Sequence, residues 1–301
     1  MNPRDIVIAG VGVVSPLGCD AGEFWRKLQA SERGHQREIQ FDGRPPLPCF
    51  SPPNFDVDKI ISSSRLRRVG PITQFACAAA ALAIRDANLS LEDKAAMRRV
   101  GVVTAVSHGG ISFTLQFHRE LVEQGARAAS PMLFPETVYN AASSHLAAVL
   151  GCDHVNYTIV GDAAAAFNAV AMACDLLELG AVERCLVVGA EEADWVVANA
   201  YHRNGERFVA SEGAGAILLA RGGKGCARIV EVDRGHPFHS RAERKALHDG
   251  AMAAQYGEAF TAGAMWQLIA DAFRTRDSRV QARSDCAGLN EQVSTIILAP
   301  V

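Results

Sequence analysis

The chain has 301 residues, of which 49% are hydrophobic and 21% are charged, and its formal net charge is −3 at pH 7. These values are ordinary for a globular α/β protein built as one large domain or as two fused halves. Charge is spread along the chain without a block of one sign, which argues against a nucleic-acid partner.

Buried strands and helices alternate in the N-terminal part of the chain. DIVIAGVGVV at 5–14 predicts a buried strand, and DAGEFWRKLQA at 20–30 predicts a short helix. The proline-rich run FDGRPPLPCFSPPNFD at 41–56 predicts an irregular surface loop. GPITQFACAAAALAIRDANL at 70–89 predicts a long helix, and because small residues surround it, we expect it to be central. RVGVVTAVSHGG at 99–110 predicts another buried strand.

The same alternation continues to the C-terminus. Helices are expected at 111–125, late in 130–151, at 163–180 and at 257–274, and strands at 156–160, 183–193, 213–221, 226–238 and 292–301. Strands that alternate with helices predict a layered α/β architecture, with a mixed or parallel sheet between helices.

The eight cysteines are dispersed, with no C-x-x-C pair and no Cys/His spacing that suits zinc. We therefore expect free, mostly buried thiols, no metal and no other cofactor. No window approaches about 18 uncharged apolar residues, and the apolar start lacks the basic region of a signal peptide. The sequence thus favours a cytoplasmic protein without a membrane span.

The stretch NYTIVGDAAAAF at 156–167 predicts a strand, a tight turn and the start of a helix. Enzymes often place a nucleophile at such a corner, because the helix N-terminus stabilises negative charge there. Here the turn presents Asp162 followed by four alanines, and a methyl group cannot form a covalent intermediate. Asp162 can cap the helix through its carboxylate or act as a base, and the sequence leaves both roles open.

Several stretches, taken in order, resemble the β-ketoacyl synthases, the condensing enzymes of fatty-acid and polyketide assembly. They include VIAGVGVVSPLG, QFACAAAALAIRDANL, RVGVVTAVSHGG, SPMLFPETVYNAASSHLAAVLG, ERCLVVGAEEAD and SEGAGAILLAR. The resemblance implies a thiolase-like α-β-α-β-α fold and dimerisation. It also implies a complete N-terminal half at 1–225 and a shortened C-terminal half at 226–301.

The resemblance places substitutions at the positions that carry the family's chemistry. The family's nucleophilic cysteine aligns with Ala163. In AAQYGEAFTAGA at 253–264, the family's lysine position is Ala253 and its second histidine position is Glu258, where an ionised carboxylate would repel a developing enolate. The motif of the family's first histidine is not found. We therefore expect no catalytic residues, as in the chain-length factors that pair with an active ketosynthase.

Two groups of residues are candidates for binding partners. The family's dimer interface and acyl tunnel imply such roles for Met132, Phe134, Tyr139, Asn140 and Asp162, although ordinary core packing is the alternative. A basic stretch is a candidate for docking an acyl carrier protein, or is an ordinary solvated face; its members are Arg65, Arg67 and Arg68.

The sequence favours a non-catalytic subunit that pairs with an active ketosynthase and shapes the acyl pocket, in polyketide, polyene or fatty-acid-type biosynthesis. One alternative is an enzyme that hydrolyses or decarboxylates acyl thioesters with Asp162, Glu258 or a histidine of GHPFHS, which are His236 and His239. Another is a homodimeric module that binds acyl chains or carrier protein. Glu258 can also be a plain surface or salt-bridge group.

Overall fold

The computed structural model describes residues 6–127, 129–203, 209–237, 251–288 and 292–301; the side chains of Pro237 and residues 251–253 are not described. The strands are β1 (Ile6–Val14), β2 (Gln36–Ile39), β3 (Leu47–Phe50), β4 (Val100–Val106), β5 (Asn156–Val160), β6 (Arg184–Glu191), β7 (Ala210–Ser211), β8 (Gly213–Arg221), β9 (Ala227–Pro237), β10 (Ala282–Ala287) and β11 (Gln292–Ala299). The helices are α1 (Ala21–Gln29), α2 (Val57–Ile60), η2 (Ser64–Arg68), α3 (Pro71–Asp86), α4 (Lys94–Arg98), α5 (Ile111–Gln124), η3 (Phe134–Glu136), α6 (Ala141–Leu150), α7 (Ala164–Glu178), α8 (Trp195–Arg203), α10 (Ala251–Tyr256) and α11 (Phe260–Ser278).

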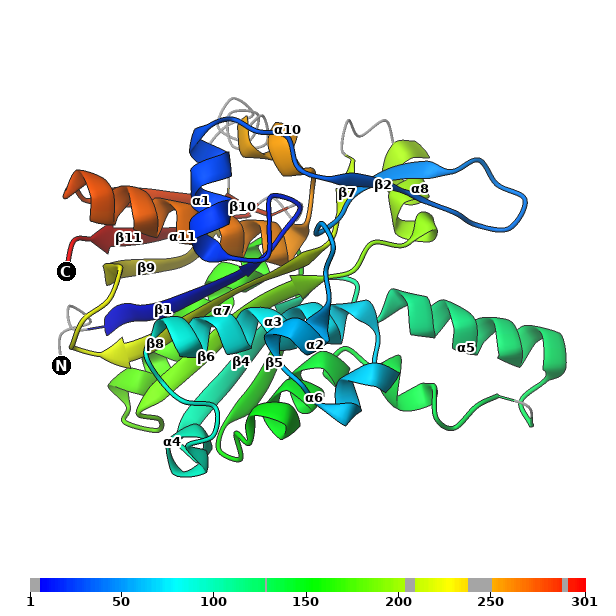
Figure 1. Ribbon diagram of the computed structural model, residues 1–301, viewed down its shortest axis with the longest axis horizontal. Coiled ribbons are helices and arrows are strands. Elements are labelled where there is room, and N and C mark those ends of the chain that lie inside the picture. Colours follow the sequence, from blue (N-terminus) through cyan, green and yellow to red (C-terminus); the bar gives the residue numbers. More distant parts are fainter. Residues whose placement is uncertain (1–5, 128, 204–208, 238–250, 289–291) are drawn as a thin grey trace.

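A mixed sheet of eight strands runs through the molecule in the order β10-β11-β9-β1-β8-β6-β4-β5 (Figure 1). Strand β4 pairs in parallel with β5 and β6, whereas the other pairs in this sheet are antiparallel. Because the carboxyl ends of parallel strands lie at one edge, the segments that follow β4, β5 and β6 come together. This edge holds the candidate site.

Buried helices cover both faces of the sheet. Helix α3 packs against β1, β6 and β8 on one face, and helices α7 and α11 pack against β4, β6 and β8 on the other. The same two helices also contact β9, β10 and β11, so strands lie on two sides of them. The mixed α/β layers confirm the predicted fold class. The division at residue 225 remains a prediction, because β9 pairs with both β1 and β11.

Small residues allow these layers to approach closely. A Cβ atom added at Gly12 in β1 would lie 1.9 Å from the carbonyl oxygen of Ala79 in α3. A Cβ atom at Gly189 in β6 would lie 2.3 Å from the carbonyl oxygen of Thr261 in α11. The alanines of α3 are buried, which agrees with its predicted central position.

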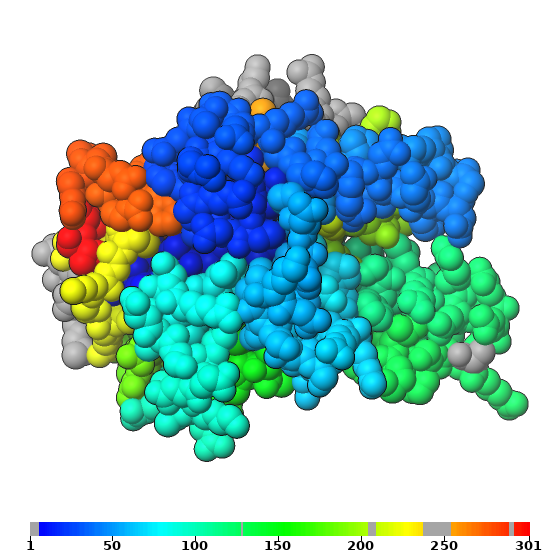
Figure 2. Space-filling model, viewed as in Figure 1, coloured from blue at the N-terminus to red at the C-terminus, as the bar shows by residue number. Residues whose placement is uncertain are grey.

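The proline-rich stretch is more ordered than its composition indicates. It contains strand β3, which pairs with β2, so the expected irregular loop is in part a hairpin. Phe41 near the hairpin's tip stacks on Trp195 of α8 with ring centroids 5.1 Å apart, and the Nε1–H of Trp195 donates to the carbonyl oxygen of Pro45 at 2.8 Å. These contacts outside the segment hold the chain extended despite its prolines. The hairpin and α5 project on the same side of the molecule (Figure 2).

The C-terminal helix and the cysteines can be compared with the predictions in the same way. The helix expected from residue 257 begins at Phe260 in α11, after the separate helix α10. All eight cysteines are free, as expected. Within the described residues, no helix has the length and apolar character that a membrane crossing requires.

Candidate functional site

The site lies where the carboxyl ends of β4, β5 and β6 meet the start of α11. Strand β5 ends at Val160, and Ala163 is the first residue with helical geometry, with φ −52°. The side-chain Oδ1 of Asp162 accepts a hydrogen bond from the backbone N–H of Ala164 at 3.0 Å. The carboxylate of Asp162 therefore caps the helix, which was one of the two roles that the sequence left open.

Two adjacent glutamates at the end of β6 hold the surrounding segments. Glu191 is 1% exposed and accepts hydrogen bonds from the N–H of Ser107 at 2.7 Å and from the hydroxyl of Thr261 at 2.6 Å. It thus ties the end of β4 to the first turn of α11. Glu192 accepts hydrogen bonds from the N–H groups of Ile72 and Ser112, at 3.1 and 2.7 Å, and so holds the first turns of α3 and α5. Burial raises the pKa of Glu192, although these hydrogen bonds oppose the shift.

The side chain of Glu258 is half-buried immediately before α11. Its Oε1 accepts a hydrogen bond from the N–H of Phe260 at 2.8 Å, which satisfies a donor at the start of α11. Burial raises the pKa of the Glu258 carboxyl, and the nearby Glu191 carboxylate raises it further. The Glu258 carboxylate therefore contacts the backbone at the start of α11, which a plain surface group would not do.

Cys286 on β10 adds a thiol to the same region. It is buried, and desolvation raises its pKa, with further increases from Glu258 and Asp162. The two carboxylates disfavour a thiolate, which is the nucleophilic form of cysteine. Cys174 in α7 is also buried, with its pKa raised to about 12, as expected for a core thiol.

Three aromatic side chains pack together beside these carboxylates. The ring of Phe260 lies 4.9 Å from the ring of His108 and 5.2 Å from the ring of Tyr201. Phe260 adopts φ +43°, a left-handed conformation that costs free energy in a non-glycine residue. The Nδ1 of His108 lies 3.7 Å from Oε2 of Glu191. His108 was not predicted as a site residue from the sequence, although its position after a buried strand and before a glycine pair is typical of one.

Four of the five residues predicted as pocket or interface candidates lie on η3 or beside it, before α6, whereas Asp162 caps α7. Met132, Phe134 and Tyr139 are 72%, 57% and 51% exposed, so ordinary core packing does not describe them. Asn140 precedes α6 and its side chain makes no capping hydrogen bond. A Cβ atom added at Gly109 would lie 3.0 Å from the ring of Tyr139, which places this tyrosine beside the end of β4.

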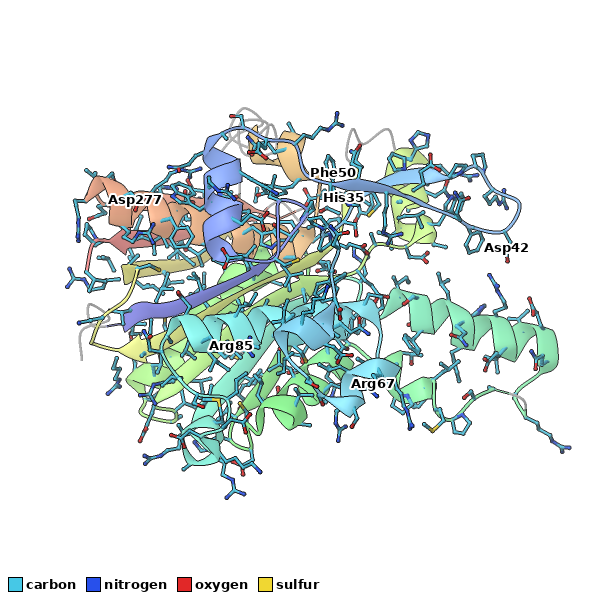
Figure 3. The ribbon with its side chains drawn as sticks, viewed as in Figure 1. His35, Asp42, Phe50, Arg67, Arg85 and Asp277 are labelled. Carbon is cyan, nitrogen blue, oxygen red and sulfur yellow. The ribbon has the colours of Figure 1, made fainter. Side chains whose placement is uncertain are left out.

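The three arginines lie on the turn η2, away from the glutamates. Leu66 in this turn is fully buried, whereas Arg65, Arg67 and Arg68 are exposed. Figure 3 labels Arg67 on this turn. In the described part of the chain, the Nε of Arg67 makes one long contact of 4.0 Å, with Oδ2 of Asp58. The charges are therefore presented to solvent from a fixed backbone.

Other candidates from the sequence stand apart. Ala253 lies in α10, where its side chain is not described, and His239 lies outside the described residues. His236 lies on β9, where its Nδ1 is 2.9 Å from Oδ2 of Asp233. In the described part of the chain, no group of three or more His, Cys, Asp or Glu residues could hold a metal ion.

Comparison with known proteins agrees with this geometry. The family model described as β-ketoacyl synthase, N-terminal domain, matches residues 3–198. The chain is 24% identical to 3-oxoacyl-[acyl-carrier-protein] synthase 2 of Vibrio cholerae, over 84% of this chain and 68% of that protein. It is 26% identical to the enzyme of the same name from Staphylococcus aureus strain N315, again over 84% and 68% of the two chains.

Solved structures share the fold at lower identity. A structure titled as the ishigamide ketosynthase/chain length factor has a TM-score of 0.80 at 19% identity, covering 98% of this chain and 99% of that one. A type II polyketide acyl-carrier protein in complex with its ketosynthase gives 0.78 at 15% identity, covering 100% of both chains. A β-ketoacyl synthase from Burkholderia phymatum gives 0.78 at 15% identity, covering 99% and 100%.

The layered sheet and the strand-turn-helix corner together define a protein of the thiolase-like ketosynthase class. With its family model matching residues 3–198, the chain belongs to the β-ketoacyl synthase family.

Proposed function

We propose that this protein is a non-catalytic ketosynthase subunit, which pairs with an active β-ketoacyl-ACP synthase and shapes its acyl pocket. The proposal is supported by Ala163 at the start of α7, the position that the resemblance aligns with the family's nucleophile. Without a thiol at that point, the acyl group cannot transfer from carrier protein to this chain by the family's route.

In this proposal, the other groups of the site do not replace the family's nucleophile or its histidines. Glu258 stands at the family's histidine position, and its carboxyl is engaged with the N–H of Phe260. Burial favours its neutral form, and the pKa of Cys286 is raised by the same carboxyl. Burial and the neighbouring carboxyls also raise the pKa of Cys286, so this thiol stays largely protonated and does not replace the family's nucleophile.

The exposed apolar surface supports pairing with another chain. Strand β5 is the last strand of its sheet, and its outward groups have no partner strand within the described residues. Tyr157 and Val160 on this strand are 49% and 48% exposed. Helix α5, which follows β4 along the chain, has no buried residue. An open strand edge with exposed apolar side chains is a surface that proteins commonly cover with a partner.

The proposed partner set also includes an acyl carrier protein. Carrier proteins that expose acidic side chains would be attracted to the exposed arginines of η2, whose backbone is anchored by the buried Leu66. One solved relative is a complex of a ketosynthase with its carrier protein, which makes such docking reasonable in this fold. For this chain the docking remains part of the proposal.

Co-purification tests the pairing directly. The tagged protein is co-expressed with a cysteine-bearing ketosynthase encoded beside its gene, purified, and analysed by size exclusion with light scattering. We expect a stable one-to-one complex, with this chain required for the length of the product. The proposal fails if the chain forms only a homodimer while the ketosynthase elutes separately; that result favours the homodimeric binding module.

One observation favours a second candidate function. The carboxyl of Glu258 has a raised pKa, and such groups act as acids in hydrolytic and decarboxylating enzymes. Release of malonate, acyl acid or CO₂ from a carrier-bound thioester by this protein alone, abolished in Glu258→Gln, would favour an altered enzyme over a silent subunit.

A further inference from the structure

Two elements project from the same side of the molecule (Figure 2), and their outer ends are in contact. One is helix α5, and the other is the hairpin formed by β2 and β3. The Nη1 of Arg119 on α5 lies 3.3 Å from Oδ2 of Asp42 at the hairpin's tip, and its guanidinium carbon lies 5.9 Å from the ring centroid of Phe41. Figure 3 shows Asp42 on the side of the hairpin that faces α5. We call these two contacts of Arg119 the latch.

The same parts of the chain also meet at the candidate site. His108 lies between β4 and α5, and Tyr201 lies on α8, to which the hairpin is fixed by the stacking of Phe41 on Trp195. The hydroxyl of Tyr201 lies 3.4 Å from Nε2 of His108, and both rings pack on Phe260. The latch is therefore the outer contact between these parts, and the packing of His108 on Tyr201 is the inner contact.

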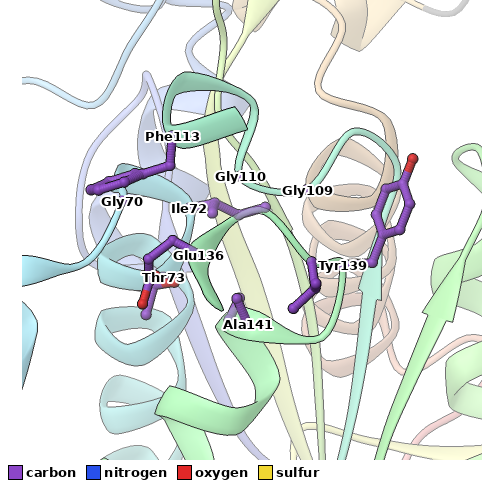
Figure 4. Close-up of a pocket in the computed structure, with 11 residues that line it drawn as sticks. Gly70, Ile72, Thr73, Gly109, Gly110, Phe113, Glu136, Tyr139 and Ala141 are labelled. Carbon is purple, nitrogen blue, oxygen red and sulfur yellow. The ribbon is translucent and has the colours of Figure 1, made fainter. Parts of the chain in front are cut away.

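The base of α5 is packed firmly. The backbone N–H and the hydroxyl of Ser112 donate to Oε1 of Glu192 at 2.7 and 2.8 Å. A Cβ atom added at Gly70 would lie 3.0 Å from the ring of Phe113, and Figure 4 shows these two residues close together. The space beside them, between the starts of α3, α5 and α6, has a free volume of about 10 Å³, which is room for about one water molecule. The first turn of α5 is therefore a fixed point about which the rest of the helix can turn.

Beyond its base, α5 is held loosely. All of its residues are described, and none of them is buried. The ring of Phe117 lies 5.8 Å from the ring of Phe134, which is itself 57% exposed. Gly109 before the helix and Gly125 after it adopt φ +65° and +83°, and no described atom lies within 4 Å of a Cβ built at Gly125. Because glycine accepts a wide range of backbone angles, it can absorb the change when a helix turns as a unit.

The latch itself is built from exposed groups. The side chains of Arg119 and Asp42 are 50% and 86% exposed. Exposed ion pairs and exposed cation–π contacts contribute little free energy, and salt screens the ion pair. Contacts of this strength break and form again easily, which suits a closure that has to open.

We infer that α5 is a lid on the candidate site, which the latch holds closed against the hairpin. When the latch breaks, the outer end of α5 turns away from the hairpin about its first turn, and the ring of His108 becomes more accessible to solvent. The inference goes beyond the proposed function, because such a lid serves a silent subunit and an altered enzyme alike.

A permanent surface contact is the alternative interpretation. The hairpin does not need Arg119 for its order, because Trp195 already stacks on Phe41 and donates a hydrogen bond to the carbonyl oxygen of Pro45. A helix that is fixed permanently is commonly held by buried apolar side chains, which α5 lacks. The lid accounts for both observations, since it requires a rigid hairpin and a helix that can leave it.

Double electron–electron resonance on the full-length protein measures the separation of the two elements. Spin labels are attached to Val122→Cys on α5 and Arg44→Cys at the hairpin's tip, both exposed positions. The half-buried Cys19 and Cys226 are replaced by serine, and the remaining thiols are buried. We expect one dominant short distance with the latch intact. Arg119→Met should add a longer distance and raise the open-to-closed ratio about five- to tenfold.

Salt and a milder substitution divide the latch into its two contacts. Raising NaCl from about 0.05 to about 1 M should increase the open fraction of the labelled parent and leave that of Arg119→Met unchanged, because only the ion pair is screened. Asp42→Asn keeps the contact with Phe41 and should open the lid by a smaller factor than Arg119→Met.

Reaction of His108 with diethyl pyrocarbonate, measured by peptide mass spectrometry, reports access to the site. We expect His108 to react severalfold faster in Arg119→Met than in the wild type. His118 is exposed on α5 and serves as the internal reference, so its rate should be the same in both proteins.

Arg127→Met is the matched control, because Arg127 is exposed beyond the end of α5 and its loss removes the same charge. It should change neither the distances nor the rate at His108. Unchanged distances in Arg119→Met, or an equal change in Arg127→Met, overturn the inference. A longer distance without faster reaction at His108 also overturns it, because α5 would then move without controlling access to the site.

Discussion

At the scale of single residues, the proposal depends on Ala163, the position that the resemblance aligns with the family's nucleophile. Ala163 places a methyl group where the helix N-terminus would stabilise a thiolate. Burial, and to a lesser extent neighbouring carboxyls, raise the pKa values of Glu258 and Cys286. In the proposed silent subunit, the surroundings therefore favour neutral groups over charged ones.

This environment makes a specific prediction for Ala163→Cys. The new thiol would lie at the first turn of α7, next to Asp162, whose carboxylate opposes its ionisation. We expect slow alkylation by iodoacetamide, no acyl-enzyme by mass spectrometry after incubation with an acyl thioester, and condensation at the background rate. Cys174→Ala in the same background controls for modification of the core thiol. Appreciable condensation by Ala163→Cys would show that the C-terminal residues still supply the required chemistry.

The sequence predicted part of this site and missed another part for a physical reason. The β-branched residues before Gly161 indicate a strand, and the alanines after Asp162 indicate a helix. The strand-turn-helix corner could therefore be predicted from neighbouring residues alone. The packing of His108 against Phe260 depends on residues far apart in the chain and on a strained backbone at Phe260. No local pattern encodes such a contact.

At the scale of elements, close packing of helices on the sheet depends on small residues. The interior position of α3 follows from its alanines and from Gly12, where β1 leaves no room for a side chain. In the hairpin formed by β2 and β3, by contrast, contacts with distant residues outweigh the local sequence preference. Proline indicated a loop locally, but stacking of Phe41 on Trp195 and pairing between the strands outweigh that preference.

Replacing Gly12 by alanine tests the close approach of α3 and β1. The added Cβ would lie 1.9 Å from the carbonyl oxygen of Ala79, a backbone atom that cannot move without shifting α3. We expect the free energy of unfolding to fall by about 3 kcal/mol or more, measured by urea denaturation followed by circular dichroism. Gly263→Ala in α11 is the control, because its Cβ would meet Ala259 at an ordinary 3.7 Å. That variant should be neutral or slightly stabilising, by about 0.5 kcal/mol; an equal loss in both would refute the packing argument.

At the scale of the whole molecule, several large apolar side chains are exposed around η3 and on β5. Met132, Phe134 and Tyr139 lie exposed on the segment around η3, and Tyr157 and Val160 lie exposed on the terminal strand β5. Figure 1 shows α5 projecting from the body of the fold, and the ring of Phe117 on this helix lies 5.8 Å from the ring of Phe134. An element that projects without a fully buried residue gains stability when another chain covers it.

Tyr157→Glu tests whether the β5 edge is the pairing surface. The tyrosine is 49% exposed, so a charged replacement should leave the fold intact, with the free energy of unfolding within about 1 kcal/mol of wild type. At an interface, the glutamate would be desolvated without a partner charge, and we expect the complex with the ketosynthase to weaken by at least about tenfold. The dissociation constant is measured by biolayer interferometry on the immobilised ketosynthase.

Val280→Glu is the matched control for this substitution, since Val280 is 63% exposed in the turn between α11 and β10, apart from β5 in the sheet order. It adds the same charge and removes a similarly exposed apolar side chain, so it should bind the ketosynthase as the wild type does. Equal weakening by both variants would point to a general effect of net charge. Unchanged binding by Tyr157→Glu would move the interface away from β5, because a buried glutamate at that position could not be tolerated without loss of affinity.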